Sequence, residues 1–129
     1  MNDTLIAEEI LDLIIGFQYL MESESKEKYD IKHKILHLVS KREQTSPNYL
    51  VEVLNIARSN LAITCNQLIK DGLLEKHKEA GSKKEIYYCA TEKGRKLIDE
   101  KLARTEKTLS KLRNKSKIRK TAQELTKMF

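Results

Sequence analysis

The chain of 129 residues has no tryptophan and few of the residues that interrupt helices or cross-link a fold: one proline, four glycines and two cysteines. With 34% charged residues and so few helix breakers, the composition favours helices joined by short loops. Two cysteines 24 positions apart do not form a disulfide framework, so we expect a reduced chain. This length fits a single domain of modest core, residues 1–129, and leaves no room for a separate catalytic domain.

The sequence also lacks the motifs of an enzyme. No serine lies in a glycine-flanked nucleophile elbow, and no glycine-rich phosphate loop is present. The three histidines, His33, His37 and His77, have no triad partners at a recognisable spacing. We therefore predict no catalytic residues, no cofactor and no enzymatic activity.

Uninterrupted apolar runs are missing as well. The N-terminal stretch is apolar, but Asp3, Glu8, Glu9 and Asp12 interrupt it too often for a membrane span. No secretory leader precedes the first apolar stretch. The sequence therefore predicts a cytoplasmic protein with no membrane partner.

Positive charge is what the chain has in excess. Its net charge is +6 at pH 7, and its pI is about 9.3. Residues 1–30 carry a net charge of −6, so the other 99 residues carry +12. A basic body suits a polyanionic partner, because each neutralised phosphate releases counterions into solvent. A solvated lysine-rich surface has the same composition, so charge alone does not identify the partner.

Residues 46–94 hold the most informative pattern, which begins with a short helix. Ser46 and Pro47 start this helix, because a hydroxyl caps free amide groups and proline at the first helical position loses no hydrogen bond. The helix runs to about Leu54. Residues 55–57 then form a tight turn, which is typical of a helix-turn-helix.

A second helix follows, and we expect Ser59 or Asn60 to cap it and Gly72 to end it. Its apolar positions recur at intervals of four and three, so one side faces a core. The inward residues are Leu61, Cys65 and Leu68. The residues left outside are Asn60, Ala62, Ile63, Asn66 and Gln67.

A hairpin and a further helix complete the pattern. Residues 73–77 and residues 86–90 read as strands, with the turn at residues 80–82. Thr91 caps the next helix, and Gly94 allows close backbone approach in its first turn. The order of parts predicts a winged helix-turn-helix, a mainly α fold with a small β wing (α+β), over residues 29–91.

Both ends of the chain carry helical seams of apolar residues, over residues 1–22 and 92–129. One chain can bury the first seam against its own body. Between two copies, however, the acidic first helix is complementary to residues 101–129, which hold ten lysines and arginines and two glutamates. We therefore predict a homodimer joined by N- and C-terminal dimerisation helices. The predicted contacts are Ile6, Ile10, Leu13, Phe17, Leu20, Leu102, Leu109, Leu112 and Leu125.

These segments resemble the MarR (multiple antibiotic resistance regulator) family of transcription factors. The match lies in LVEVLNIARSNLAITCNQLIKDGLLEK and in ATEKG, which is similar to the family's leucine-threonine-x-x-glycine after the wing. Most winged-helix families share the first stretch, so the second stretch and the terminal helices are what point to the MarR family in particular. The chain departs from the family at Ser82 and Lys84, where an aspartate and an arginine are common, and at Ile63 and Ala90, where arginine and leucine are frequent. PadR-like winged-helix regulators dimerise mainly through a C-terminal helix, an arrangement that would leave the N-terminal apolar seam of this chain without a role.

The resemblance implies a sequence-specific double-stranded DNA-binding regulator, most often a repressor, whose first and last helices build the dimer. It also implies a possible small, aromatic and anionic effector, for which Phe17, Tyr19 and Tyr29 are candidate lining residues. A two-fold dimer predicts a pseudo-palindromic operator with half-sites roughly 10 base pairs apart.

The expected DNA contacts divide into two groups. Amide side chains pair with adenine in the major groove, and apolar side chains touch thymine methyl groups, whereas cations hold phosphates. The candidates for base reading are Asn60, Ala62, Ile63, Asn66 and Gln67. The candidates for phosphate or wing contacts are Arg58, Ser59, Lys76, His77, Lys78, Lys83 and Lys84.

Three other functions remain open from the sequence. A winged helix also serves as a protein-interaction or assembly adaptor. A metal-sensing regulator would use His33 and His37, one helical turn apart, with Glu22, Glu24 or a C-terminal acid, although the neighbouring lysines favour a solvated face and no metal site is predicted. A thiol-sensing regulator would use Cys65 and Cys89, although both fit small core positions.

Overall fold

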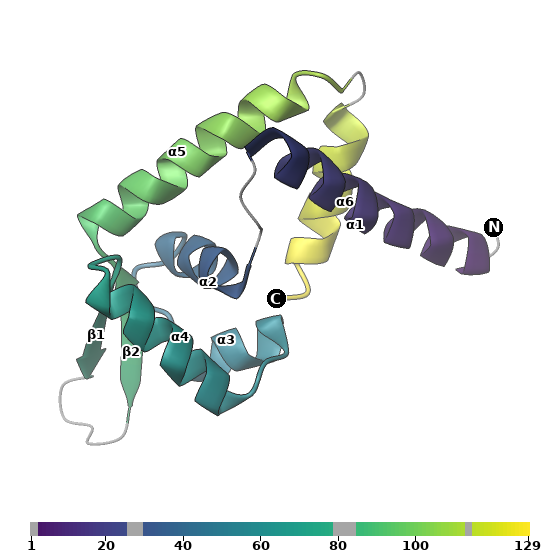
Figure 1. The fold of residues 1–129 in the computed structure, drawn as a ribbon. Coiled ribbons are helices and arrows are strands. Elements are labelled where there is room, and N and C mark those ends of the chain that lie inside the picture. The colour runs from purple at the N-terminus through teal and green to yellow at the C-terminus, as the bar shows by residue number, and fades with distance from the viewer. Residues whose placement is uncertain (1–2, 26–29, 79–84, 113–114) are drawn as a thin grey trace.

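The computed structural model describes residues 3–25, 30–78, 85–112 and 115–129, and within them it contains six helices and a two-stranded antiparallel sheet (Figure 1). This confirms the predicted mainly α winged-helix fold. None of the described helices combines the length and the hydropathy that a membrane span needs. In chain order the elements are α1 (Asp3–Ser25), α2 (Ile31–Ser40), α3 (Pro47–Leu54), α4 (Arg58–Lys70), β1 (Leu74–Lys78), β2 (Ile86–Ala90), α5 (Glu92–Leu109) and α6 (Lys115–Thr126).

The core lies within the winged-helix part, where α2, α3, α4, the sheet and the start of α5 meet. The inward positions predicted for the second helix are confirmed, because Leu61, Cys65 and Leu68 are all buried. They pack with buried residues of the other elements into one cluster. The further members are Ile35, Leu36, Leu38, Val39, Leu50, Leu74, Tyr88 and Ile98.

The helix α3 has the predicted bounds because its ends are set locally. The Ser46 hydroxyl oxygen accepts a hydrogen bond from the Tyr49 amide at 3.2 Å, and Pro47 is the first helical residue. Asn55 ends the helix with a left-handed backbone (φ 51°), a conformation that asparagine tolerates better than most residues. The helix-turn-helix therefore has the predicted tight turn at residues 55–57.

The predicted cap of α4 is wrong. The helix begins at Arg58 with Ala57 in the cap position, and no side chain caps it. The left-handed residue Asn55 reverses the chain early, so Leu61 N already donates to Ala57 O at 3.0 Å. Ser59 and Asn60 consequently lie inside the first helical turn with exposed side chains.

The wing pairs Leu74 with Ala90 and Lys78 with Ile86, so its first strand starts one residue later than predicted. An isolated bridge to the wing was not predicted: Thr45 exchanges two backbone hydrogen bonds with Tyr88, at 2.8 and 3.0 Å. This bridge fixes the α2–α3 connection beside the wing. The expected turn at residues 80–82 lies outside the described residues.

Gly94 in the first turn of α5 confirms the expected close approach. Thr91 caps α5, because its hydroxyl oxygen accepts a hydrogen bond from Gly94 N at 3.1 Å. A Cβ atom at Gly94 would lie 2.2 Å from the carbonyl oxygen of Leu73. The start of α5 is therefore packed directly on the backbone that leads into the wing.

Beyond the core, α5 leads away from the winged-helix part, and α1 and α6 lie toward its far end (Figure 1). The helix α1 has two apolar faces. On the inner face, Leu13, Phe17 and Leu20 line an open groove together with Leu112 and Ile118 of the same chain. Tyr19 also borders this groove, whereas Tyr29 lies outside the described residues.

The outer apolar face of α1 is uncovered. Leu11 is 60% exposed and Ile15 is 63% exposed, and we call this surface the α1 stripe. Only Ile10 of the predicted N-terminal seam belongs to it, since Ile6, Leu13, Phe17 and Leu20 are partly buried within the protomer. The members of the α1 stripe are Ile10, Leu11, Ile14 and Ile15, together with Tyr19 at its edge, where this side chain also borders the groove.

The C-terminal members of the predicted dimer contact also differ in exposure. Leu109 and Leu112 are partly buried within the protomer. Leu102 on α5 and Leu125 on α6 are exposed, as is the terminal Phe129. The helices predicted to dimerise, α1, α5 and α6, therefore each carry uncovered apolar side chains in the protomer.

Candidate nucleic-acid interface

The solvent side of α4 carries all five residues predicted to read bases. Asn60, Ala62, Ile63, Asn66 and Gln67 are exposed, and Ile63 is 58% exposed although it is a large apolar residue. At about 100° per residue, Ile63 lies close to the middle of the outward face, opposite the buried residues. The helix therefore presents an apolar and amide surface, with its only cations near its two ends.

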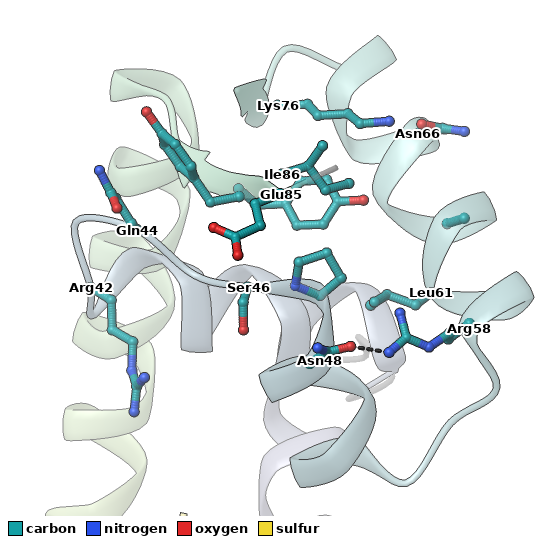
Figure 2. Close-up of a pocket in the computed structure, with 14 residues that line it drawn as sticks. Arg42, Gln44, Ser46, Asn48, Arg58, Leu61, Asn66, Lys76, Glu85 and Ile86 are labelled. Atoms are coloured by element: carbon teal, nitrogen blue, oxygen red, sulfur yellow. Dashed lines mark hydrogen bonds between the residues drawn. The ribbon is translucent and has the colours of Figure 1, made fainter. Parts of the chain in front are cut away.

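A hollow of about 710 Å³ lies beside this face, between α3, α4 and the wing (Figure 2). Of the predicted residues, it brings together Arg58, Ala62 and Asn66 from α4 with Lys76 from β1. Asn60, Ile63 and Gln67 do not line it. The other residues around it are Arg42, Gln44, Ser46, Pro47, Asn48, Leu61, Glu85, Ile86, Tyr87 and Tyr88.

Four charged side chains line the hollow, and three of them are cations. Arg42 comes from the α2–α3 connection, Arg58 from the start of α4 and Lys76 from the wing, whereas Glu85 lies just before β2. Three cations within one concave surface favour an anion such as a backbone phosphate. The hollow is therefore suited to a nucleic-acid strand that runs beside α4.

Two of these cations are held by α3. Arg58 donates a hydrogen bond from Nη2 to the side-chain oxygen of Asn48 (Figure 2). The guanidinium carbon of Arg42 lies 3.8 Å from the ring centroid of Tyr49, a cation–π contact. Both arginines are exposed to solvent, so their remaining N–H groups are available to a ligand.

The wing residues face in two directions. Lys76 lies on the same side of the hairpin as the buried Leu74 and so reaches the hollow. His77 lies on the other side, where its ring stacks on Tyr87 with centroids 5.5 Å apart and its Nε2 atom lies 3.0 Å from Glu75. Lys78 is exposed at the end of β1, and the predicted contacts Lys83 and Lys84 lie outside the described residues.

Sequence reasoning missed Arg42, Gln44, Asn48 and Tyr87 as members of this surface. None of the four belongs to the second helix, whose periodicity supplied most candidates. Arg42 and Gln44 reach the hollow because the Thr45–Tyr88 bridge holds the α2–α3 connection beside the wing, whereas Asn48 lies on α3 and Tyr87 on β2. The one available signal was the Ser46–Pro47 helix start, which places the next residue on an exposed first turn.

The two cysteines have different surroundings. Cys65 is buried and hydrogen-bonds with Tyr88, and burial raises the pKa of the thiol to about 11. Burial likewise raises the pKa of Tyr88 to about 12. Cys89 is only partly buried, so the expectation of a core position holds for Cys65 alone. The Sγ atom of Cys89 donates a hydrogen bond to Glu43 O at 3.0 Å, and burial raises the pKa of this thiol as well. Thiols kept protonated at neutral pH are poor nucleophiles, which does not favour thiol sensing.

The two histidines of α2 are partly buried, not on a solvated face as predicted. His33 Nδ1 lies 2.8 Å from the carboxylate of Asp30, which also caps the helix by accepting from His33 N. His37 lines a small cavity of about 250 Å³ between α2 and α5, and Lys41, Arg95 and Asp99 line it too. Within the part of the chain that the structure describes, no group of three or more histidine, cysteine or acidic side chains is arranged to hold a metal ion.

The histidine His37 is expected to make the fold sensitive to mild acid. Burial, and secondarily the charge of Lys41, lowers its pKa from the usual 6.5, so the folded state favours the neutral imidazole more than the unfolded chain does. The unfolded chain takes up a proton as pH falls through 6.5, so the free energy of unfolding is fully retained above that pH and decreases below it. We expect His37→Gln to reduce the difference in the free energy of unfolding between about pH 7.5 and about pH 5.5, measured by urea denaturation. An unchanged difference would contradict this assignment.

Comparison with known proteins relates the chain to DNA-binding proteins of the same fold. Residues 31–94 match the family model of the winged helix DNA-binding domain, a binding module and not an enzyme. No curated protein sequence is significantly similar to the chain. Several solved structures share its fold over nearly the whole length.

Three of these structures illustrate the similarity. The transcriptional regulator BldR from Sulfolobus solfataricus has 18% identity and a TM-score of 0.63, covering 98% of this chain and 92% of its own. FabT from Streptococcus pneumoniae, solved in complex with DNA, has 13% identity and a TM-score of 0.64, covering 98% and 94%. MarR has 14% identity and a TM-score of 0.64, covering 99% and 97%. At these identities the likeness is one of fold.

Proposed function

We propose that this chain, which matches a winged helix DNA-binding domain over residues 31–94 and has the fold of MarR-type transcriptional regulators, acts as a homodimeric repressor on a pseudo-palindromic operator. The observation that carries this proposal is the pairing of an exposed, nearly uncharged α4 with a hollow lined by three cations. The first surface is suited to base edges in a major groove, and the second to phosphates. Repression follows when the bound dimer occludes a promoter.

Ile63, Asn66 and Gln67 are the residues we assign to base reading, with Asn60 and Ala62 on the flanks. An amide side chain forms two hydrogen bonds with adenine, and an isoleucine side chain contacts the methyl group of thymine. A recognition helix without an interior arginine should therefore prefer A/T-rich half-sites. Arg58, Ser59, Lys76 and Lys78 are assigned to phosphates, and Lys83 and Lys84 are proposed to extend this contact along the wing.

The proposed dimer rests on the apolar surfaces left uncovered in the protomer. The α1 stripe is broad and lies on a helix that holds six acidic residues and no basic ones. The described part of α6 is basic and exposes Leu125. Contact between α1 of one copy and the C-terminal helices of another would bury apolar area and pair opposite charges. A two-fold dimer then places two α4 helices on successive turns of DNA.

The proposed assignment of some residues to base reading and others to phosphate contacts is tested by comparing Asn66→Ala and Gln67→Ala with Lys76→Ala. We expect each amide variant to lose roughly 1–3 kcal/mol of discrimination between the selected operator and random duplex, because base-specific hydrogen bonds are lost. The lysine variant should bind both DNAs more weakly and should show a salt slope reduced by about 1. Operators are first selected from a random pool, and affinities are then measured by mobility shift at several salt concentrations.

Lys96→Ala is the matched control, because Lys96 is an exposed lysine on α5 outside the hollow. It should leave both affinities unchanged. Equal effects of Lys76→Ala and Lys96→Ala would show that only the total charge matters. Failure of the wild-type protein to bind any duplex would instead favour the protein-interaction adaptor.

A further inference from the structure

The first turn of α3 contacts both arginines of the hollow. Asn48 accepts the hydrogen bond from Arg58, and Tyr49 lies beneath the guanidinium of Arg42. In Figure 2, Arg42 and Arg58 lie on opposite sides of Ser46, at the start of α3. Two adjacent residues of one helix therefore hold cations that enter the site from two other segments of the chain.

These contacts leave the arginines able to bind a second partner. A guanidinium has five N–H donors, and the contact with Asn48 uses one donor nitrogen of Arg58. A cation–π contact uses the face of the guanidinium and leaves its N–H edge free. Both groups therefore keep the planar fork that pairs with two oxygen atoms of a phosphate.

A free arginine on the surface samples many rotamers and loses that freedom when it binds a phosphate. Holding the side chain before DNA arrives removes part of this cost. We propose that Asn48 and Tyr49 are positioning residues that orient Arg58 and Arg42 for phosphate contacts on either side of α3. This inference rests on the proposed DNA-binding function and adds α3, which supplies no predicted contact, to the interface.

The alternative is that the contact between Asn48 and Arg58 simply ties α3 to α4. The packing of the two helices does not depend on it, because Leu50 of α3 and Leu61 of α4 are buried in the shared core. Asn48 and Arg58 are both exposed. An exposed pair of this kind contributes little to folding, so its effect should be found in binding.

A double-mutant cycle tests the proposal for Arg58. Asn48→Ala should weaken binding to every duplex by roughly threefold to tenfold, because the phosphate contact of Arg58 is lost or loosened. In the Arg58→Ala background, the same Asn48→Ala change should have no further effect, because the group that it positions is gone. The salt slope should decrease in Asn48→Ala almost as much as in Arg58→Ala, whereas a merely structural role would leave it unchanged.

Gln44→Ala is the matched control, because Gln44 is an exposed amide that lines the same hollow. Its effect on affinity should combine multiplicatively with that of Arg58→Ala. Multiplicative effects of Asn48→Ala and Arg58→Ala would overturn the proposal for this pair. So would a coupling between them that appears in the midpoint of urea unfolding and not in DNA affinity.

The second pair is tested with two replacements of Tyr49, which also packs against the core. Tyr49→Phe keeps the aromatic ring and should retain wild-type affinity, whereas Tyr49→Leu keeps apolar bulk and should weaken binding. In the Arg42→Ala background the phenylalanine and leucine variants should bind equally well. A difference that persists without Arg42 would overturn the proposal for this pair. If the wild-type protein bound no DNA, the proposed function itself would be overturned. This result differs from failure of the positioning proposal, in which the wild-type protein still binds DNA.

Discussion

A chain carrying both Leu11→Asp and Ile15→Asp is expected to be monomeric and to bind its operator at least about 100-fold more weakly than the wild type. Both side chains are prominent in the α1 stripe, one helical turn apart, and are more than half exposed in the protomer. Aspartate at these positions would bury charge in the proposed dimer contact without a partner. A monomer presents one α4 to the DNA and loses the gain in affinity that two linked half-site contacts provide.

Sedimentation measures the oligomeric state, and a mobility shift measures operator affinity. The matched control is Leu11→Met with Ile15→Leu, which keeps both positions apolar and should remain dimeric. Circular dichroism should show an intact fold in both double variants, because neither position is buried. A dimeric aspartate variant, or a monomeric wild-type protein, would contradict the proposed role of the α1 stripe.

Gly94→Ala is expected to lower the free energy of unfolding by roughly 2–4 kcal/mol. The added Cβ would lie 2.2 Å from the carbonyl oxygen of Leu73 and 3.2 Å from its carbonyl carbon, and both are backbone atoms. Relieving this clash requires a movement of the backbone between α4 and β1, where Gly72 has a left-handed conformation (φ 77°). The start of α5 would then shift relative to the wing.

Gly16→Ala supplies the control for this substitution, because a Cβ at Gly16 would meet no atom within 4 Å. In α1, which contains Gly16, an alanine at this position should stabilise the fold by about 0.5–1 kcal/mol, because glycine loses more backbone entropy than alanine on folding. Urea denaturation of the two variants gives the comparison. If Gly94→Ala proved as stable as Gly16→Ala, the packing described between α5 and Leu73 would be wrong.

The parts of the fold that follow from local chemistry were predictable. Ser46, Pro47 and Asn55 set the bounds of α3 through a cap, a fixed φ angle and a left-handed turn. The spacing of Leu61, Cys65 and Leu68 gave the buried side of α4, because helical periodicity needs no knowledge of the partner elements. The predicted cap of α4 was wrong because the helix begins two or three residues earlier than Ser59 or Asn60 suggested, with Ala57 in the cap position and no side-chain cap.

The candidate site was only partly predictable, because it joins segments that are far apart in the sequence. The outward residues of α4 were found from periodicity, and their role in DNA reading stays a prediction. Arg42, Gln44 and Asn48 carry no periodic signal, and they reach the hollow through the Thr45–Tyr88 bridge and the packing of α3 against α4. Such pairings between distant segments depend on tertiary packing and not on local preference.

The sequence by itself determined the winged helix, the buried and exposed sides of α4 and the presence of apolar helices at both ends, since each depends on spacing within one segment. Only the tertiary structure decided which apolar face of α1 is free. The helix is apolar on two sides, so periodicity allows either face to be the contact; Leu112 and Ile118 line the groove with Leu13, Phe17 and Leu20 and leave the α1 stripe uncovered. Burial depends on what the rest of the chain places against a face, and that information lies outside the helix itself.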